Sequence, residues 1–213
     1  MNTMQRRALL ACAGSAFLLA GCISVGVGNS DSGVQAQYRL EDLTPATGKA
    51  SKTVARSLVV ASLPSIGVGD TFSLAYSKAP QQRALYQYAS WADRPSNRIV
   101  QLLVRRIEAR GAFASVAELG SGIAGDLALN VTVDELVHDV PGARGRLQLT
   151  AELVDRSTRT LVARRRFQVD APVPQENASG AVEALSRALT SVLDEMIPWL
   201  EAAADKLPAT AAR

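Results

Sequence analysis

The stretch DLALNVTVDELVHD (residues 126–139) alternates apolar and polar side chains, with Leu127, Leu129, Val131 and Val133 separated by Ala128, Asn130 and Thr132. The same pattern recurs in GRLQLTAELVD (residues 145–155) and in TLVARRRFQVD (residues 160–170). Alternation with a period of two places the apolar residues on one face of a strand. We therefore expect three antiparallel strands with one buried face and one solvated face.

The rest of the chain supplies shorter strands and two helices. The additional strand candidates are residues 56–62, 71–76, 85–91 and 113–119. Helical spacing predicts one helix from Ser96, acting as its N-cap, to Arg110, where Gly111 ends it. A second helix is predicted from Asn177 or Ser179 to Ala203. The expected fold is a single α/β domain, with a mixed, largely antiparallel sheet of about six to seven strands packed by two main helices.

The chain divides by composition into four segments. We expect a signal peptide at residues 1–21, a flexible Gly- and Ser-containing tether at 22–37, a folded domain at 38–203 and a disordered tail at 204–213. The remaining 192 residues after the signal suit one domain with a substantial core.

The first segment has the features of a bacterial lipoprotein signal. Arg6 and Arg7 precede an apolar run from Ala8 to Ala20, and Leu19-Ala20-Gly21-Cys22 places small residues before a cysteine. Thirteen apolar residues are too few to span the ~30 Å core of a bilayer as a helix. We expect cleavage before Cys22, whose thiol then carries a diacylglyceryl group, with palmitate as a further acyl chain.

Lipidation places the domain in the cell envelope. Ile23 and Ser24 follow the cysteine, whereas an aspartate there would favour the inner membrane of many Gram-negative bacteria. The expected location is therefore the outer membrane, facing the periplasm.

Charge and cysteine content exclude several classes of function. Without the two signal arginines, the chain carries 21 basic and 20 acidic side chains, so nucleic acid is not an expected partner. Cys12 and Cys22 both lie outside the predicted domain, which excludes a disulfide framework or a cysteine zinc site within it. We expect no cofactor and no metal.

Two motifs offer chemistry that their context does not support. Gly120 to Gly125 (GSGIAG) matches G-x-G-x-x-G, but a strand follows it where a dinucleotide fold needs a helix. His138 is the single histidine and is predicted to be exposed at a strand end, without a serine-hydrolase elbow. We therefore predict that the protein is not an enzyme.

Two further groups are candidates for contact with partners. Arg164-Arg165-Arg166 is the densest charge cluster, and it suits either a solvated, protected sheet edge or contact with lipid headgroups or an acidic partner. Tyr86, Tyr88 and Trp91 lie in one predicted strand, with Tyr86 and Tyr88 on one face and Trp91 on the other. These aromatic residues are the candidate partner interface.

The order of these features resembles the ABC-type transport auxiliary lipoprotein family, which includes the paraquat-inducible protein C-like lipoproteins. The similarity rests on the lipobox, Tyr38-Arg39-Leu40, the strand Arg56 to Val60, Tyr86 through Trp91, LLVRRIEARGAF, LQLTAELVD, LVARRRF and a last helix ending in Trp199-Leu200. It extends over residues 38–200.

This resemblance implies an outer-membrane docking lipoprotein of an ABC-type or mammalian-cell-entry-type system for intermembrane lipid transport. The implied partners are the membrane, through the lipid anchor, and the transporter or mammalian-cell-entry proteins, and a homo-oligomer is also compatible with it. The alternative is a lipoprotein regulator or scaffold of peptidoglycan assembly.

Overall fold

A computed structural model describes residues 35–44, 48–65 and 70–208 of the chain. Contacts divide the chain into Met1–Val34 and Gln35–Arg213, and the fold below belongs to the second unit. The predicted signal peptide, Cys22 and most of the predicted tether lie outside the described residues.

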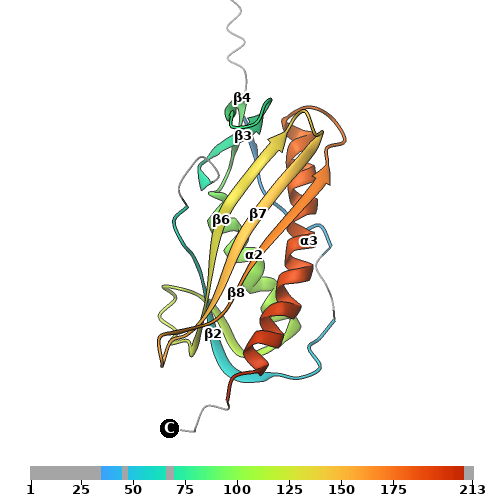
Figure 1. The fold of residues 1–213 in the computed structure, drawn as a ribbon. Helices are drawn as coiled ribbons and strands as arrows, with labels where there is room; N and C mark the ends of the chain where they lie inside the picture. Colours follow the sequence, from blue (N-terminus) through green and yellow to red (C-terminus); the bar gives the residue numbers. More distant parts are fainter. Residues whose placement is uncertain (1–34, 45–47, 66–69, 209–213) are drawn as a thin grey trace, which may run out of the picture. The chain divides into compact units, whose positions relative to one another are not determined.

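The α/β class and the mixed sheet with two main helices are confirmed (Figure 1). The strands are β1 (Ala36–Tyr38), β2 (Val54–Ser62), β3 (Ser73–Ser77), β4 (Ala84–Trp91), β5 (Phe113–Glu118), β6 (Leu127–Asp139), β7 (Arg144–Asp155) and β8 (Thr160–Pro172). The helices are α2 (Pro95–Arg110) and α3 (Ala178–Asp205). Within the described residues the sheet has eight strands, where about six to seven were expected. The additional strand is β1, so Ala36 and Gln37 belong to the sheet and not to the tether.

Strand β6 connects the two parts of this sheet. One edge of β6 pairs with β7 in antiparallel register from Leu127 to Asp139, and β7 pairs in turn with β8. The other edge is shared: residues 127–131 pair with β2 in parallel, while His138 and Asp139 pair with β3. Strand β2 continues to β5, and β3 continues through β4 to β1. The antiparallel ladders carry most of the pairing, as expected.

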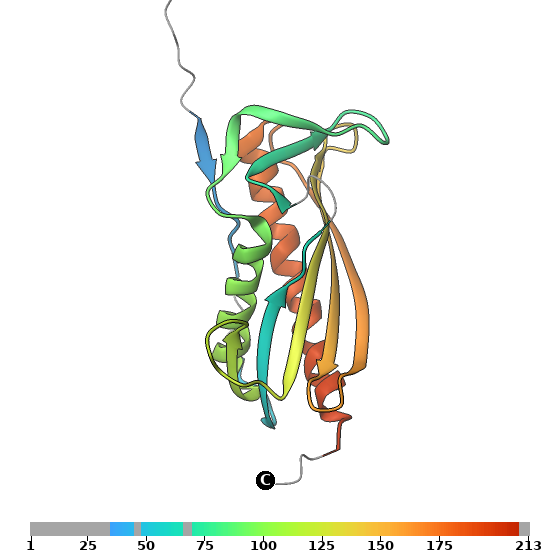
Figure 2. The ribbon, with the colours of Figure 1, turned by 90° about the vertical axis from the view of Figure 1, so that its left-hand side faces the viewer.

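Both helices lie on one side of the sheet, as Figure 2 shows. The alternating apolar residues of β6 and β7 face them and are almost fully buried, among them Leu127, Leu129, Val131, Leu147, Leu149 and Leu153. Phe167 of β8 packs edge-on against Trp199 of α3, with ring centroids 5.6 Å apart. The two-period pattern of the sequence therefore identified the core face.

The alternation of buried and exposed residues in β6 shifts by one residue at a β-bulge. Pairing with β7 shifts between Val133 and Glu135, so that Leu136 returns to the buried face after Asp134 has pointed outward. A bulge inserts one extra residue and redirects the side chains that follow it.

The prediction that Ser96 is the N-cap of α2 is wrong. Arg94 occupies the N-cap position without a capping side chain, Pro95 is in the first turn, and Ser96 lies inside the helix. The side chain of Asp70 instead accepts the N–H of Ser96 at 3.0 Å. A carboxylate from a distant loop thus satisfies a free donor at the positive end of the helix dipole. Gly111 ends the helix as predicted, with φ 68°.

Helix α3 begins within the predicted range, with Asn177 as its N-cap, and runs further than predicted. The side chain of Asn177 accepts the N–H of Gly180 at 2.8 Å. The helix continues through Pro198 to Asp205. Ala204 and Asp205, which were assigned to a disordered tail, are therefore helical, while residues 209–213 lie outside the described residues.

A strap of residues 40–44 joins β1 to the two helices. From α2, Arg98 donates to the Leu40 carbonyl at 2.9 Å, and the buried Arg106 pairs with Asp42 at 2.9 Å. Arg106 also donates to the Thr44 carbonyl and contacts Asp194 of α3. From α3, Thr190 accepts the N–H of Leu43 at 2.9 Å. The strap is thus held to both helices by side chains that are themselves buried.

Replacing Arg106 tests the contribution of this network. Arg106→Ala leaves the buried Asp42 carboxylate without its cation, which costs about 3–5 kcal/mol when a buried ion pair is broken. Urea denaturation monitored by circular dichroism measures this loss. Arg105→Ala is the matched control, because Arg105 is exposed on the same helix, and its effect should stay within about 0.5 kcal/mol. Equal stabilities of the two variants would contradict a stabilising strap.

Candidate functional site

The structure separates the three aromatic residues of β4. Trp91 is 3 % exposed and belongs to the core beneath the sheet. Tyr86 is half-buried, and Tyr88 is 56 % exposed. Of the predicted interface residues, only Tyr88 therefore offers its ring freely to solvent.

Tyr86 is held by a buried histidine. Its hydroxyl forms a hydrogen bond of 2.6 Å with Nδ1 of His138, and the two rings are almost parallel. Tyr76 of β3 also packs against Tyr86, at 4.9 Å between ring centroids. Burial, with smaller contributions from Tyr76 and Glu176, raises the pKa of Tyr86 to about 12. Tyr86 is therefore a neutral hydroxyl that fastens β4 to β6.

The prediction of an exposed His138 is wrong, because the side chain is only 1 % exposed. Strand β3 pairs with β6 at His138, and Tyr86 of β4 packs against the ring. Tyr86 precedes His138 by 52 residues and β3 lies still earlier in the chain, so the local sequence around His138 contains no sign of this cover. The second ring nitrogen, Nε2, has no hydrogen-bond partner within the described part of the chain.

Removing the tyrosine hydroxyl tests this fastening. Tyr86→Phe leaves Nδ1 of His138 buried without a partner, and we expect a loss of about 1–3 kcal/mol of unfolding free energy. Tyr88→Phe removes an equivalent hydroxyl two residues away on the same strand, where it is exposed. This control should change stability by less than about 0.5 kcal/mol in the same urea titration.

The same histidine predicts a pH dependence of stability. Burial lowers the pKa of His138, against weaker opposing effects of Glu176 and Asp139, so the folded protein favours the neutral ring. In the unfolded chain the pKa of histidine is about 6.5, so below this pH the unfolded chain binds a proton that the folded protein does not. The free energy of unfolding is therefore highest above about pH 6.5 and decreases as the pH falls below it. Unfolding free energy should therefore fall more in the native protein than in His138→Gln between about pH 7.5 and pH 5.5. Parallel pH profiles would contradict a neutral buried ring.

The exposed part of β4 forms a surface that we call the β4 rim, made of Leu85, Gln87 and Tyr88. Leu85 is 48 % exposed, although the alternation placed it on one face with the buried Ala89 and Trp91. The pairing of β4 with β3 shifts register between Ser73 and Ala75, which breaks that face into two parts. Strand β1 pairs only with Ala89 to Trp91 of β4. The rim residues come before this segment, so they have no partner strand on the β1 side within the described residues.

The glycine-rich motif is a loop, as predicted. Gly120 and Gly122 have φ values of 99° and 82°, and β6 follows the motif directly. No helix opens from its last glycine, so the geometry of a dinucleotide site is not present here.

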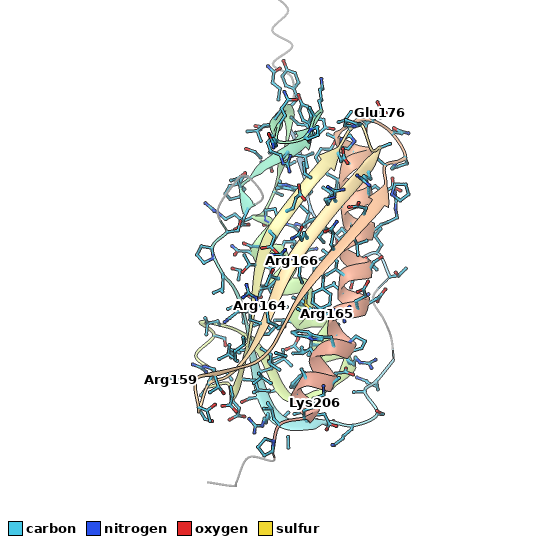
Figure 3. The ribbon with its side chains drawn as sticks, in the orientation of Figure 1. Arg159, Arg164, Arg165, Arg166, Glu176 and Lys206 are labelled. Carbon is cyan, nitrogen blue, oxygen red and sulfur yellow. The ribbon has the colours of Figure 1, made fainter. Side chains whose placement is uncertain are left out.

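The arginine run lies on the outer edge of the sheet (Figure 3). Strand β8 pairs with β7 alone among the described strands, and all three arginines are exposed. Arg164 pairs with Glu152 of β7, and Arg165 stacks on Phe167 while reaching Glu195 of α3. These contacts suit an edge protected against further strand pairing.

The described residues contain no group of three His, Cys, Asp or Glu side chains that could hold a metal ion. A cleft of about 310 Å³ lies between the start of β2 and the end of α3. Its charged groups are engaged, since Lys52 pairs with Asp205 and Arg56 with the buried Asp155. No helix of the described residues combines the length and apolar character needed to span a membrane.

One sheet with two helices on one face defines the class as an α/β domain, and the sequence ahead of it carries the lipobox pattern at Leu19 to Cys22. The chain belongs to the ABC-type transport auxiliary lipoprotein component family, whose model matches residues 38–197. This confirms the resemblance inferred from the sequence. Membership makes the protein an auxiliary lipoprotein of ABC-type transport and places it in the cell envelope.

Solved structures share the fold. A protein from Xanthomonas campestris, described as a DUF330 family member, is 24 % identical with a TM-score of 0.72, over 80 % of this chain and 97 % of that one. An uncharacterized protein is 14 % identical with a TM-score of 0.62, over 78 % and 99 % of the two chains. At these identities the likeness establishes the fold alone. No curated protein matches the sequence.

Proposed function

We propose that this protein is a non-catalytic docking lipoprotein of an intermembrane lipid transport system, fastened to the outer membrane through acylated Cys22. The observation that carries the proposal is the family match over residues 38–197, which follows a complete lipobox at Leu19 to Cys22. The partners are the ABC-type or mammalian-cell-entry-type components of that system. Ile23 and Ser24 after the cysteine support the outer membrane as the location.

The physical role of such a protein is to hold a binding surface near a membrane. Two acyl chains give stable attachment, since each buried CH₂ contributes about 0.8 kcal/mol. Gln35 lies thirteen positions after Cys22, and the flexible tether predicted there would have a root-mean-square reach of about 18–22 Å. Confinement to this distance raises the effective concentration of the domain at its partner without any new contact.

Membrane attachment is tested at the predicted lipidation site. Cys22→Ser should move the protein from the membrane fraction to the soluble periplasmic fraction, or leave it unprocessed at the inner membrane, because no thiol remains to be acylated. Cys12→Ser is the control, since it lies within the predicted signal and should keep the native distribution. Fractionation combined with intact-mass measurement shows both outcomes. A mature native protein without added acyl mass would contradict the anchor.

The partner is tested by crosslinking in intact cells. We expect components of an ABC transporter or mammalian-cell-entry proteins to be joined to the native protein, identified by mass spectrometry, and to be lost with Cys22→Ser. Selective recovery of cell-wall synthases instead would contradict the transport role and favour a regulator of envelope assembly. Measured turnover of a substrate by the purified protein would contradict the non-catalytic assignment.

A further inference from the structure

The β4 rim combines exposed apolar and aromatic side chains in one short stretch of strand. Leu85 and Tyr88 are about half exposed, and they lie within three residues of each other, about 10 Å along the strand. Between them, Tyr86 is held inward by His138, and the pairing of β4 with β3 passes from Ser90 to Leu85 without a partner for Tyr88.

The chain enters the fold beside this rim. Strand β1 pairs in parallel with the second half of β4, with Ala36 opposite Ala89. Gln35, the first described residue, therefore lies next to the position of Tyr88 in this register. Because Gln35 lies thirteen positions after Cys22, an acylated cysteine joined by the predicted flexible tether would keep the rim within about 18–22 Å of the leaflet on average.

The chemistry of the rim suits the boundary between lipid chains and headgroups. Tyrosine is enriched at this boundary because its ring is apolar and its hydroxyl stays hydrated. Leu85 supplies apolar area that can enter the acyl region. Gln87 lies between them and can remain at the level of the headgroups.

Cationic side chains accompany aromatic rings at the same end of the sheet. Lys78, which follows β3, lies 5.6 Å from the ring of Tyr76, and Arg94 lies 5.5 Å from the exposed ring of Phe72. Neither cation forms an ion pair with a carboxylate of the described residues. Glu176, near the start of α3, is the opposing charge at this end (Figure 3). The two cations outnumber this carboxylate, so the charge at this end of the sheet favours contact with phospholipids whose headgroups are neutral or negative.

We propose that the β4 rim rests on the glycerophospholipid leaflet that holds the acyl chains of Cys22, so that the domain has one fixed orientation on its membrane. This inference rests on the anchor in the proposed function. It follows that the β7–β8 turn at residues 156–159 and the end of α3 point away from the leaflet, because they lie at the opposite end of β6 (Figure 1). That end, about 40 Å from the rim along the thirteen residues of β6, faces the transport partner.

The test uses single labelling sites in the lipidated protein. Neither cysteine of the chain lies in the folded domain, so Leu85→Cys and Tyr88→Cys each introduce one thiol for an environment-sensitive fluorophore. Leu161→Cys is the matched control, since Leu161 is 55 % exposed on β8 near the opposite end. The proteins are reconstituted in vesicles of phosphatidylethanolamine and phosphatidylglycerol. Circular dichroism checks that each labelled variant keeps the native fold.

We expect brominated acyl chains to quench the labels at positions 85 and 88, and aqueous iodide to quench the label at position 161. Equal quenching by iodide at all three positions would overturn the inference while leaving the anchor intact. Protection from iodide without quenching by brominated chains, increasing with the protein-to-lipid ratio, would also overturn it in favour of a second copy on the rim. If Cys22 of the native protein reacts with the fluorophore, its thiol is not acylated. Such a protein, when it also fails to float with vesicles in a density gradient, would overturn the anchor and this inference together.

Discussion

The pairing of β6 on both of its edges is the constraint on which the rest of the structure depends. A single strand of thirteen residues carries the β7–β8 meander on one edge and divides the other between β2 and β3. Because β3 leads to β4 and β1, the parts of the sheet are connected only through β6 in the described chain. A shift of one residue in β6 would turn its leucines from the helices to solvent. The bulge at Asp134 is therefore important, since it allows Leu136 and His138 to be buried beyond the point where the strict alternation ends.

Buried arginines secure the segments that the sheet itself does not hold. At the first end of β6, Arg56 pairs with Asp155 at 2.9 Å and donates to the Pro208 carbonyl, which links β2, the β7–β8 turn and the chain after α3. Hydrogen bonds from Ser157 and Thr158, together with Arg56, hold the pKa of Asp155 well below its usual range. Arg106 likewise links α2 to the strap, through Asp42 and the Thr44 carbonyl. Such buried pairs contribute little net stability compared with apolar replacements, but they define which segments meet, because any other arrangement leaves a buried charge unpaired.

The sequence alone predicted what depends on local periodicity and missed what depends on distant partners. The long strands, both helices, the start of α3 near Asn177 and the Gly111 stop follow from neighbouring residues, and the structure agrees. The cap of α2 comes from Asp70, which no pattern near Ser96 could reveal. His138 is covered by strands remote in sequence, and the three residues of β1 are too few to show alternation. The same limit applies to the site: an aromatic strand was recognised, but the separation of Tyr88 from Tyr86 and Trp91 required the register of β4 against β1 and β3.

This division between local and distant information explains why the function of such a domain is difficult to recognise. A catalytic site leaves a motif because its chemistry demands particular side chains, whereas a docking domain needs only exposed surfaces at suitable places on a stable fold. In this protein the exposed edge strand β8 carries arginines that discourage strand addition, and the rim of β4 presents leucine and tyrosine beside the strand where the chain enters. Arginine, leucine and tyrosine are common residue types, so the role of these two surfaces follows from where the side chains lie in the fold. Under the proposed acylation of Cys22, the two ends of the sheet become unequal, since the end where the chain enters would stay close to lipid and the other would extend away from the leaflet.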